Sequence, residues 1–451
     1  MKKIIAGIDI GSTKIACIVS SVKDGEEPKV IGVASQPSMG IKKGVVVNID
    51  QATKAISMVV EAAERMAGVR VNSVYITVNG KHLTSTNNKG VVATADPNEI
   101  SQNDVLRAIE SARTISIPSS REIIHVVPRE FIIDTQPGIK DPIGMSGSRL
   151  EVDAHIVSAV SNSLQNLVKC VEALGLNVTD IVFTGWASTI STLSETEKQL
   201  GVTLLDIGGG TTSICSFIED AITYSGSLEY GGMNLTSDMA IVLRTTLEDA
   251  EKLKINLNKV IDYNLKTKLK GSDDATAYQR LMSPKKDKKE DEQISIEEEK
   301  DMLDISILNI GNLQMVSKKM IERIIEARLK EIFGMCKDQI EQAGFNPRMP
   351  AGVVITGGSA MIPGIAQIAQ SVFGIPARVA YPKGLGGMIE EVENPQFSAL
   401  QGLIMHAAVY GMDNEPQLKT GNTLRGNGSV EDNLKGGIFD KVKRIFGGMK
   451  V

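Results

Sequence analysis

Two apolar runs, each ending in an aspartate and followed by glycine and hydroxyl residues, recur about two hundred residues apart. The first is KIIAGIDIGSTK (residues 3–14), and the second is VTLLDIGGGTTS (residues 202–213). Short continuous apolar runs are typical of buried strands. Another apolar run follows each glycine turn. Each segment therefore predicts a strand–turn–strand hairpin, unlike a P-loop or a dinucleotide fingerprint, whose turn leads into a helix.

The repeated turn has the chemistry of a phosphate site. Glycines let backbone N–H groups approach an anion, hydroxyls add donors, and a lysine adds a mobile positive charge. The candidate residues are Gly11, Ser12, Thr13, Lys14, Gly208, Gly209, Gly210, Thr211 and Thr212. Asp9 and Asp206 end the two strands, where a carboxylate could hold Mg²⁺ directly or through water. Two such hairpins predict a duplicated domain with phosphates clamped between its halves.

Two further segments fit the same site. In AGVVITGGSAMIPGI (residues 351–365), a strand precedes the turn Gly357-Gly358-Ser359, and a helix is expected after it. We expect these glycines to pack against the base or sugar of a nucleotide. In EDAEKLKI (residues 248–255), Glu251 and Lys254 share one helical face, where they could contact ribose hydroxyls and the base edge. The alternative for this pair is an ordinary solvated ion pair.

In order and spacing, these loops resemble those of the actin, sugar-kinase and heat-shock-chaperone ATPases. The resemblance implies an α/β fold of the actin-like ATPase type, with two duplicated ribonuclease-H-like domains around a cleft that holds ATP and Mg²⁺. Residues 40–56, 141–157 and 231–243 resemble the FtsA family of bacterial cell-division proteins. The last of these stretches adds Gly232 to the nucleotide-binding candidates. The family also implies a small α+β subdomain inserted in the first domain.

The domain boundaries follow from this resemblance and from local signals. We expect a first domain at residues 1–198 plus about 380–410, with the insert at 83–159. The second domain spans 199–379, and its outer subdomain covers about 231–310.

Within the insert, Ser101 and Asp104 form a capping-box-like pair. A helical stripe follows them through Val105, Ile109, Ala112 and Ile115. Pro128 predicts an edge or a break in the strand that comes next.

The sequence departs from the family in three places. Ser213 stands where the family usually has an aspartate after the paired threonines, and Trp186 stands where it has a smaller or aliphatic residue. A charged insertion at 264–304 is longer than the family implies, and its low-complexity charge blocks favour a solvated loop.

The last part of the chain predicts a membrane anchor. Residues 411–436 are rich in glycine and asparagine without an apolar period, which is typical of a disordered linker. Residues 437–451 predict an amphipathic helix with a basic polar face, which suits an anionic membrane surface. Its apolar side has Ile438, Phe439, Val442, Ile445 and Phe446, and its basic side has Lys441, Lys443 and Arg444. Docking on a partner helix and packing on the core are the alternatives.

The composition of the chain narrows the classes of function that remain. A net charge of −5 and an aromatic content of 4% give no reason to expect a nucleic-acid partner. The four cysteines are scattered and read as buried small hydrophobes, and the histidines show no metal or nucleophile spacing. No run of about 18 apolar residues predicts a membrane span, and we expect no signal peptide.

The resemblance implies an ATP-binding adaptor that self-assembles at the cytoplasmic face of the inner membrane, at the division site. It would hold the C-terminal peptide of FtsZ on the outer subdomain and recruit later division proteins through the insert. ATP turnover would be slow at most. The alternatives are an FtsA-like ATPase of type IV pilus assembly, an MreB-type filament protein, and a sugar or metabolite kinase. A kinase needs a general base at a substrate pocket, and no motif supplies one.

Overall fold

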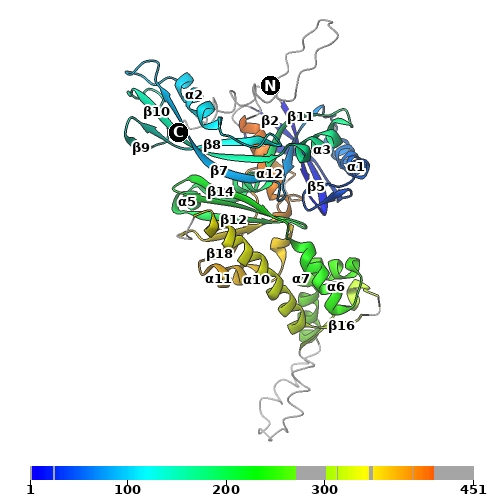
Figure 1. Ribbon diagram of the computed structural model, residues 1–451. Helices are drawn as coiled ribbons and strands as arrows, with labels where there is room; N and C mark the ends of the chain where they lie inside the picture. Colours follow the sequence, from blue (N-terminus) through cyan, green and yellow to red (C-terminus); the bar gives the residue numbers. More distant parts are fainter. Residues whose placement is uncertain are drawn as a thin grey trace.

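The computed structural model describes residues 3–23, 26–270, 301–311, 313–344, 349–388 and 390–410. The predicted linker, the predicted amphipathic helix and most of the charged insertion lie outside these residues. Figure 1 shows four parts: two packed α/β domains, a small sheet on the side of the first, and a helical outer part on the second.

The first domain is built on a six-stranded sheet in the order β11-β6-β1-β2-β3-β19. Its strands are β1 (Lys3–Ile10), β2 (Lys14–Val22), β3 (Lys29–Pro37), β6 (Ser73–Val78), β11 (Asn177–Phe183) and β19 (Gly386–Gly387). Strand β1 pairs antiparallel with β2 and parallel with β6. One face packs on α1 (Ile49–Ala67) and α3 (Ser161–Glu172), and the other on α4 (Thr184–Thr192) and α12 (Ser398–Tyr410). The sheet is therefore buried on both sides, as its continuous apolar strands require.

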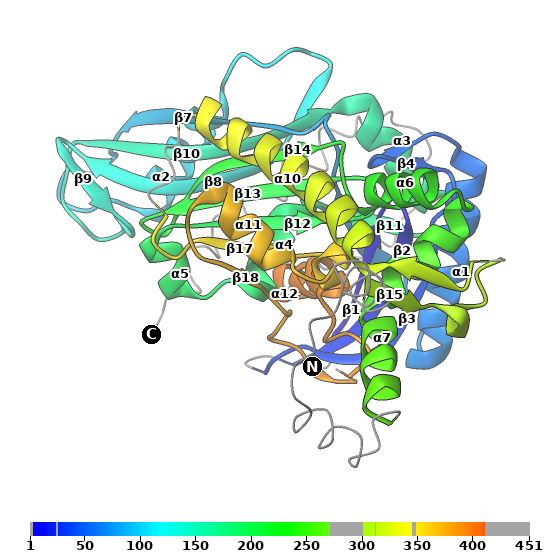
Figure 2. The ribbon, with the colours of Figure 1, turned by 90° about the horizontal axis from the view of Figure 1, so that it is seen from below.

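The second domain repeats this plan with five strands in the order β14-β13-β12-β17-β18. They are β12 (Val202–Ile207), β13 (Thr212–Ile218), β14 (Ala221–Leu228), β17 (Val353–Thr356) and β18 (Ala377–Val379). Strand β12 pairs antiparallel with β13 and parallel with β17, as β1 does with β2 and β6. Helices α10 (Lys318–Gln342) and α11 (Ile365–Phe373) cover one face, as Figure 2 shows from below. The short α5 (Glu195–Leu200) precedes β12.

The outer part of the second domain contains α6 (Gly232–Leu243), α7 (Leu247–Lys270), β15 (Met302–Asp304), the 3₁₀ turn Ser306–Leu308 and β16 (Met315–Ser317). It joins the N-terminal half of α10, and its apolar side chains continue the core of the second domain.

The small sheet has the order β7-β10-β8-β9 and carries one helix, α2. Its elements are β7 (Thr84–Ala93), α2 (Gln102–Arg113), β8 (Arg121–Ile133), β9 (Gln136–Ile139) and β10 (Arg149–Val160). The predicted capping box of Ser101 and Asp104 is present. Pro128 lies at a register shift in the β8–β10 ladder, which fits the predicted break because proline cannot donate to the ladder.

The predicted helical stripe of the insert is wrong at its last position. Helix α2 ends at Arg113, so Ile115 lies beyond it. The Thr114 hydroxyl donates to the Glu110 carbonyl oxygen at 3.0 Å, and the Thr114 backbone leaves the helical region. A β-branched residue whose hydroxyl bonds to the last turn favours a helix end.

The small sheet is bonded to the second domain along β14. Ser85 Oγ donates to the Ser225 carbonyl oxygen at 2.7 Å, and Asn87 Nδ2 donates to that of Thr223 at 3.1 Å. His155 lies 2.9 Å through Nε2 from Ser225 Oγ and 2.7 Å through Nδ1 from Asn87 Oδ1. Side chains of the insert thus satisfy backbone groups on the edge of the second sheet, where unpaired groups would otherwise remain.

Candidate nucleotide site

The repeated sequence motif folds into the same turn twice. In the β1–β2 hairpin, the backbone N–H of Gly11 donates to the carbonyl oxygen of Lys14 at 3.0 Å. In the β12–β13 hairpin, the N–H of Gly208 donates to that of Thr211 at 2.9 Å. Both turns follow an apolar strand whose second-to-last residue is an aspartate. The predicted hairpins are confirmed, and their equivalence reflects the shared strand plan of the two domains.

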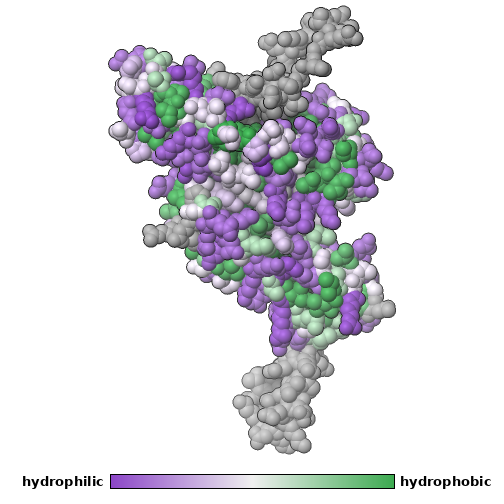
Figure 3. Space-filling model, in the orientation of Figure 1, coloured by the Kyte–Doolittle hydropathy of each residue, from purple (hydrophilic) through white to green (hydrophobic). Residues whose placement is uncertain are grey.

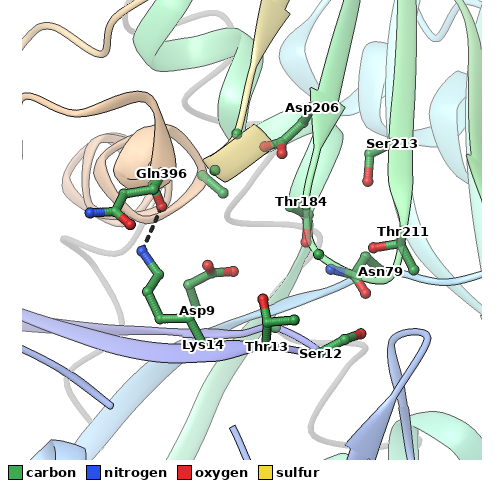
Figure 4. A pocket seen from close by; sticks show the side chains of 16 residues that line it. Asp9, Ser12, Thr13, Lys14, Asn79, Thr184, Asp206, Thr211, Ser213 and Gln396 are labelled. Carbon is green, nitrogen blue, oxygen red and sulfur yellow. Dashed lines mark hydrogen bonds between the residues drawn. The ribbon is translucent and has the colours of Figure 1, made fainter. Parts of the chain in front are cut away.

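The two turns lie against each other. A Cβ atom added to Gly209 would lie 2.9 Å from the Cβ of Thr13, and one added to Gly210 would lie 2.8 Å from the Cβ of Ser12. Real Cβ atoms do not come this close, so only glycine lets the second turn approach the hydroxyl residues of the first. The contact brings the predicted phosphate residues of both domains around one cavity (Figure 4).

The two aspartates, Asp9 of β1 and Asp206 of β12, both line this cavity. Thr77 Oγ1 donates to Asp9 Oδ1 at 2.6 Å, and Ser188 Oγ donates to Asp206 Oδ2 at 2.5 Å. Burial raises the pKa of Asp9 against the opposing effects of Thr77 and Lys14. Burial also raises the pKa of Asp206 to about 7, and the charge of Asp9 acts in the same direction. Burial and the nearby charge of Asp9 therefore favour either the protonated form of Asp206 or a bound cation.

Lys14 bridges the first hairpin and the 3₁₀ turn Pro395–Phe397, which precedes α12. Its Nζ donates to the carbonyl oxygen of Gln396 at 2.8 Å and lies 3.9 Å from the centre of the Phe397 ring. Burial lowers the pKa of Lys14 to about 8, although Asp9 and Asp206 act to raise it. Because its contacts are to a neutral carbonyl and a ring, this ammonium group can exchange them for a stronger anionic partner.

The third predicted loop closes the opposite side of the cavity. Gly357 follows β17 with a φ of 88°, and a Cβ there would lie 2.7 Å from the carbonyl oxygen of Ile207. Gly358 begins a 3₁₀ turn, Gly358–Met361. Ser359 Oγ donates to the carbonyl oxygen of Gly208 at 3.1 Å, which ties this loop to the second phosphate turn.

The predicted Glu251–Lys254 pair lies on α7 and is joined to the neighbouring glycine. Lys254 Nζ donates to Glu251 at 2.6 Å, to Thr236 Oγ1 at 2.8 Å and to the carbonyl oxygen of Gly232 at 3.1 Å. A Cβ on Gly232 would collide with Ser359 Oγ. The pair therefore lies beside the third loop and the Gly232 turn, on the side of the outer subdomain.

The cavity gathers most, though not all, of the predicted residues. Those that line it are Asp9, Gly11, Ser12, Thr13, Lys14, Asp206, Gly208, Gly209, Thr211, Gly357 and Gly358. Those that lie outside its lining are Gly210, Thr212, Gly232, Glu251, Lys254 and Ser359. The lining also contains Asn79, Thr184, Gln396 and Ala399, which the sequence did not single out, and Ser213, which it named only as a departure from the family.

This lining fits a nucleotide with Mg²⁺. Glycine turns that a Cβ would fill, hydroxyls and one ammonium group are suited to phosphate oxygens. The carboxylates of Asp9 and Asp206 could each contact Mg²⁺, either directly or through a bound water. Mg²⁺ commonly takes the rest of its oxygen ligands from substrate phosphates and water. Within the described residues, no group of three or more His, Cys, Asp or Glu side chains could hold a metal by itself.

Two domains with the same strand plan, facing hairpins and a third loop define the fold of the actin-like ATPases. The solved structure titled "PilM-PilN type IV pilus biogenesis complex" aligns with a TM-score of 0.58 and 15% identity, covering 90% of this chain and 98% of that one. At this identity the likeness shows the fold alone. The predicted fold class is confirmed.

The chain belongs to the FtsA family of cell division proteins, as its sequence predicted. Residues 80–158 match the family described as "SHS2 domain inserted in FTSA", and residues 203–402 match "Cell division protein FtsA". The FtsA of Pseudomonas aeruginosa is 32% identical, and the alignment covers 98% of this chain and 97% of that protein. The FtsA of Borreliella burgdorferi is 34% identical, with 96% and 98% covered, and that of Neisseria meningitidis is 34% identical, with 98% of each covered.

The described residues contain no helix that is long and apolar enough to cross a membrane. The membrane-binding residues predicted from the sequence, Ile438, Phe439, Lys441, Val442, Lys443, Arg444, Ile445 and Phe446, lie outside the part of the chain that the structure describes.

Proposed function

We propose that this chain is an ATP-binding adaptor of cell division that links a cytosolic filament to the inner membrane. The observation that carries the nucleotide part is the pair of equivalent turns, one from each domain, in contact around a cavity with two buried carboxylates. Each domain would hold part of the same ATP–Mg²⁺, so ATP would favour the closed arrangement of the two domains. ATP then acts mainly as a structural and switching ligand.

The partner of this adaptor would be the C-terminal peptide of FtsZ, held by the outer subdomain. A groove lined by α7, α10 and α11 supports this location. The lining combines apolar with charged and polar side chains: Leu257, Ile261, Leu303, Ile321 and Ile325 are apolar, Lys318 and Glu322 are charged, and Gln367 is polar. A groove of this kind can take the apolar side chains of a short peptide and leave its polar groups in water.

The groove can be tested without disturbing the core. Gln367 is exposed on α11 and lines the groove, whereas Gln370 is exposed on the same helix and is not part of the lining. Gln367→Trp should fill the groove and weaken co-sedimentation with FtsZ, and Gln370→Trp is the matched control. Equal binding of FtsZ by both variants would remove the groove from the proposal.

Self-association would use exposed apolar side chains, and the outer subdomain carries several. Ile241 is 75% exposed, Ile255 67%, Leu247 52% and Val242 47%. Figure 3 shows apolar surface gathered over this region. Exposed apolar groups of this size that lie close together are typical of contact surfaces between proteins. Their occupant would be a second copy of the chain, as in an actin-like filament.

The membrane attachment would come from the predicted helix at 437–451, at the division site on the cytoplasmic side. Recruitment of later division proteins would use the inserted subdomain. The decisive experiment is co-sedimentation of the full chain with anionic liposomes and FtsZ, with and without ATP–Mg²⁺. We expect the chain to carry FtsZ into the liposome pellet. If liposomes and FtsZ both remain unbound, the adaptor function is wrong.

The other candidates have less support. Sequence identity to FtsA proteins is about twice the 15% shared with the pilus complex. A kinase needs a carboxylate base beside an acceptor. Both carboxylates that line the cavity, Asp9 and Asp206, instead lie just before the two phosphate turns. Turnover of about 10 per second, with phosphorylation of a small metabolite, would favour the kinase.

A further inference from the structure

Asn79 is a buried polar residue in the cavity that none of the sequence motifs contains. It directly follows β6, the parallel neighbour of β1, and it lines the cavity with the two phosphate turns. Its side chain is largely buried, with 7% of the residue exposed. Its Oδ1 atom is buried and has no hydrogen-bond partner among the described residues. That oxygen only accepts hydrogen bonds, so the group that can serve an anionic ligand in the cavity is the Nδ2 amide, which donates.

A tight turn holds this side chain in place. Strands β4 (Ile41–Lys42) and β5 (Val45–Val46) form a hairpin whose two turn residues, Lys43 and Gly44, have φ of 50° and 76°. The N–H of Gly44 donates to Ser12 Oγ at 2.9 Å. A Cβ on Gly44 would lie 2.5 Å from the carbonyl oxygen of Asn79 and would collide with Oδ1. The hairpin therefore packs directly on Asn79 and joins it to the first phosphate turn.

The position of Asn79 along the cavity identifies the part of the ligand that it would meet. Gln396 lies beside the third loop, since a Cβ on Gly358 would contact its Cβ at 3.8 Å. Figure 4 shows Asn79 on the side of the cavity away from Gln396, next to Thr184 and Thr211, with its amide nitrogen turned toward Thr184. With the adenosine at the third loop, the phosphate chain runs between the two turns, and its end lies on the side of Asn79.

We propose that the carboxamide of Asn79 binds the terminal phosphate of ATP and is the residue by which the site distinguishes ATP from ADP. This inference rests on the proposed binding of ATP. The amide N–H₂ donates to a phosphate oxygen without adding charge, and a donor that is already fixed by its surroundings loses little freedom on binding. ADP lacks the phosphate that this donor meets.

The test measures dissociation constants for ATP and ADP, both with Mg²⁺, in the wild type and in Asn79→Ala and Asn79→Asp. A hydrogen bond to a charged group corresponds to about a tenfold change in affinity or more. We expect Asn79→Ala to weaken ATP binding by about tenfold, while the affinity for ADP stays within about twofold of the wild-type value. Asn79→Asp should weaken ATP binding further, because a carboxylate repels the phosphate.

The matched control is Asn72→Asp, which makes the same change at an exposed position just before the same strand. It should leave both affinities unchanged. The ATP-to-ADP ratio within one folded variant is insensitive to general damage, so it separates ligand binding from a structural role. Equal losses for both nucleotides, or no loss for either, would overturn the inference and leave the proposed ATP binding in place. Absence of nucleotide binding by the wild type would overturn both.

Discussion

Thr13 and Gly209 belong to different domains and touch across the cleft, so closely that a Cβ on Gly209 would lie 2.9 Å from that of Thr13. Replacing Gly209 with alanine should push the two turns apart. Because ATP would contact both turns at once, we expect Gly209→Ala to weaken ATP binding by about tenfold or more. This is the loss of affinity expected when one hydrogen bond to a charged group is removed. Titration with a fluorescent ATP analogue measures this.

The same change at Gly334 serves as a control. Gly334 lies within α10, and a Cβ there would meet nothing within 4 Å. Gly334→Ala should leave ATP binding unchanged and stabilise the fold by about 0.5–1 kcal/mol, because alanine favours a helix. If Gly209→Ala binds ATP as tightly as Gly334→Ala does, the two turns do not hold the nucleotide together.

Magnesium-dependent binding should depend on pH through Asp206. Burial raises the pKa of this carboxyl to about 7. Mg²⁺ requires the ionised form, so we expect the gain in ATP affinity from Mg²⁺ to grow between about pH 6 and about pH 8. Asp206→Ala should lose most of that gain at each pH. Isothermal titration with and without Mg²⁺ gives the comparison, and an unchanged gain in Asp206→Ala would remove Asp206 from the metal site.

The raised pKa of Asp206 also predicts how stability changes with pH. A raised folded-state pKa contributes stability that is complete below the usual value of 3.8 and is lost as the pH rises through about 7. Asp206→Asn has no charge to bury. It should therefore be more stable than the wild type by about 1–4 kcal/mol at about pH 8, and the gap should close at about pH 4. Urea unfolding without nucleotide measures the gap. A gap that is equal at the two pH values would contradict this.

His155, which is buried, and His82, which is half-buried, give a matched pair for the contact between the insert and the second domain. Both ring nitrogens of His155 are hydrogen-bonded, to Asn87 and Ser225, whereas those of His82 are buried without a hydrogen-bond partner among the described residues. His155→Leu should destabilise the fold by about 1–3 kcal/mol, because it leaves buried polar partners unsatisfied. His82→Leu should lower the free energy of unfolding only slightly, or raise it.

Thermal unfolding of the two histidine variants, compared across pH, completes this test. Burial lowers the pKa of His155 to about 3 and that of His82 to about 4, so both rings stay neutral near neutral pH. The difference between the variants should then be constant from about pH 6 to about pH 8. Equal losses of stability in the two variants would contradict the role given to the His155 hydrogen bonds.

The predicted helix at 437–451 should be the membrane anchor. Phe439→Glu together with Phe446→Glu should release the chain from anionic liposomes, because the apolar face could no longer insert. ATP binding should be unaffected. Asn427→Glu together with Asn433→Glu adds the same charge in the predicted linker and should still float with liposomes. High salt should weaken wild-type flotation only in part, since the apolar contribution is not screened. Flotation of the double phenylalanine variant would exclude this anchor.

The sequence predicted the hairpins because their information is local and repeated. A strand, an aspartate and a glycine turn identify Asp9 and Asp206 without knowledge of distant contacts. Asn79 and Thr184 belong to no such local motif, since each simply follows an apolar strand. Only the order of strands in the sheet brings them to the cavity. Gln396 meets Lys14 from 382 residues away. No pattern within a segment could indicate that contact.

The end of α2 shows that sequence patterns can also miss contacts between residues close together in the chain. Apolar spacing continued the helix to Ile115, but a single hydroxyl bond from Thr114 to the preceding turn ends it earlier. Hydrophobic periodicity reports which face is buried, and it does not report the local competition that sets the last residue.

The packing of α12 on the first sheet sets the order in which this chain can fold during synthesis. Strands β1 and β2 leave the ribosome first, yet Ile5, Ile18 and their neighbours share a core with Leu400 and Leu403 of α12. Apart from the short α4, that face of the sheet has no cover until almost all of the described chain has emerged. The second domain lies wholly between these segments, so its sheet can be complete while the first is still open. The earliest strands therefore spend the longest time exposed, and that is where a nascent chain of this protein most needs protection from aggregation.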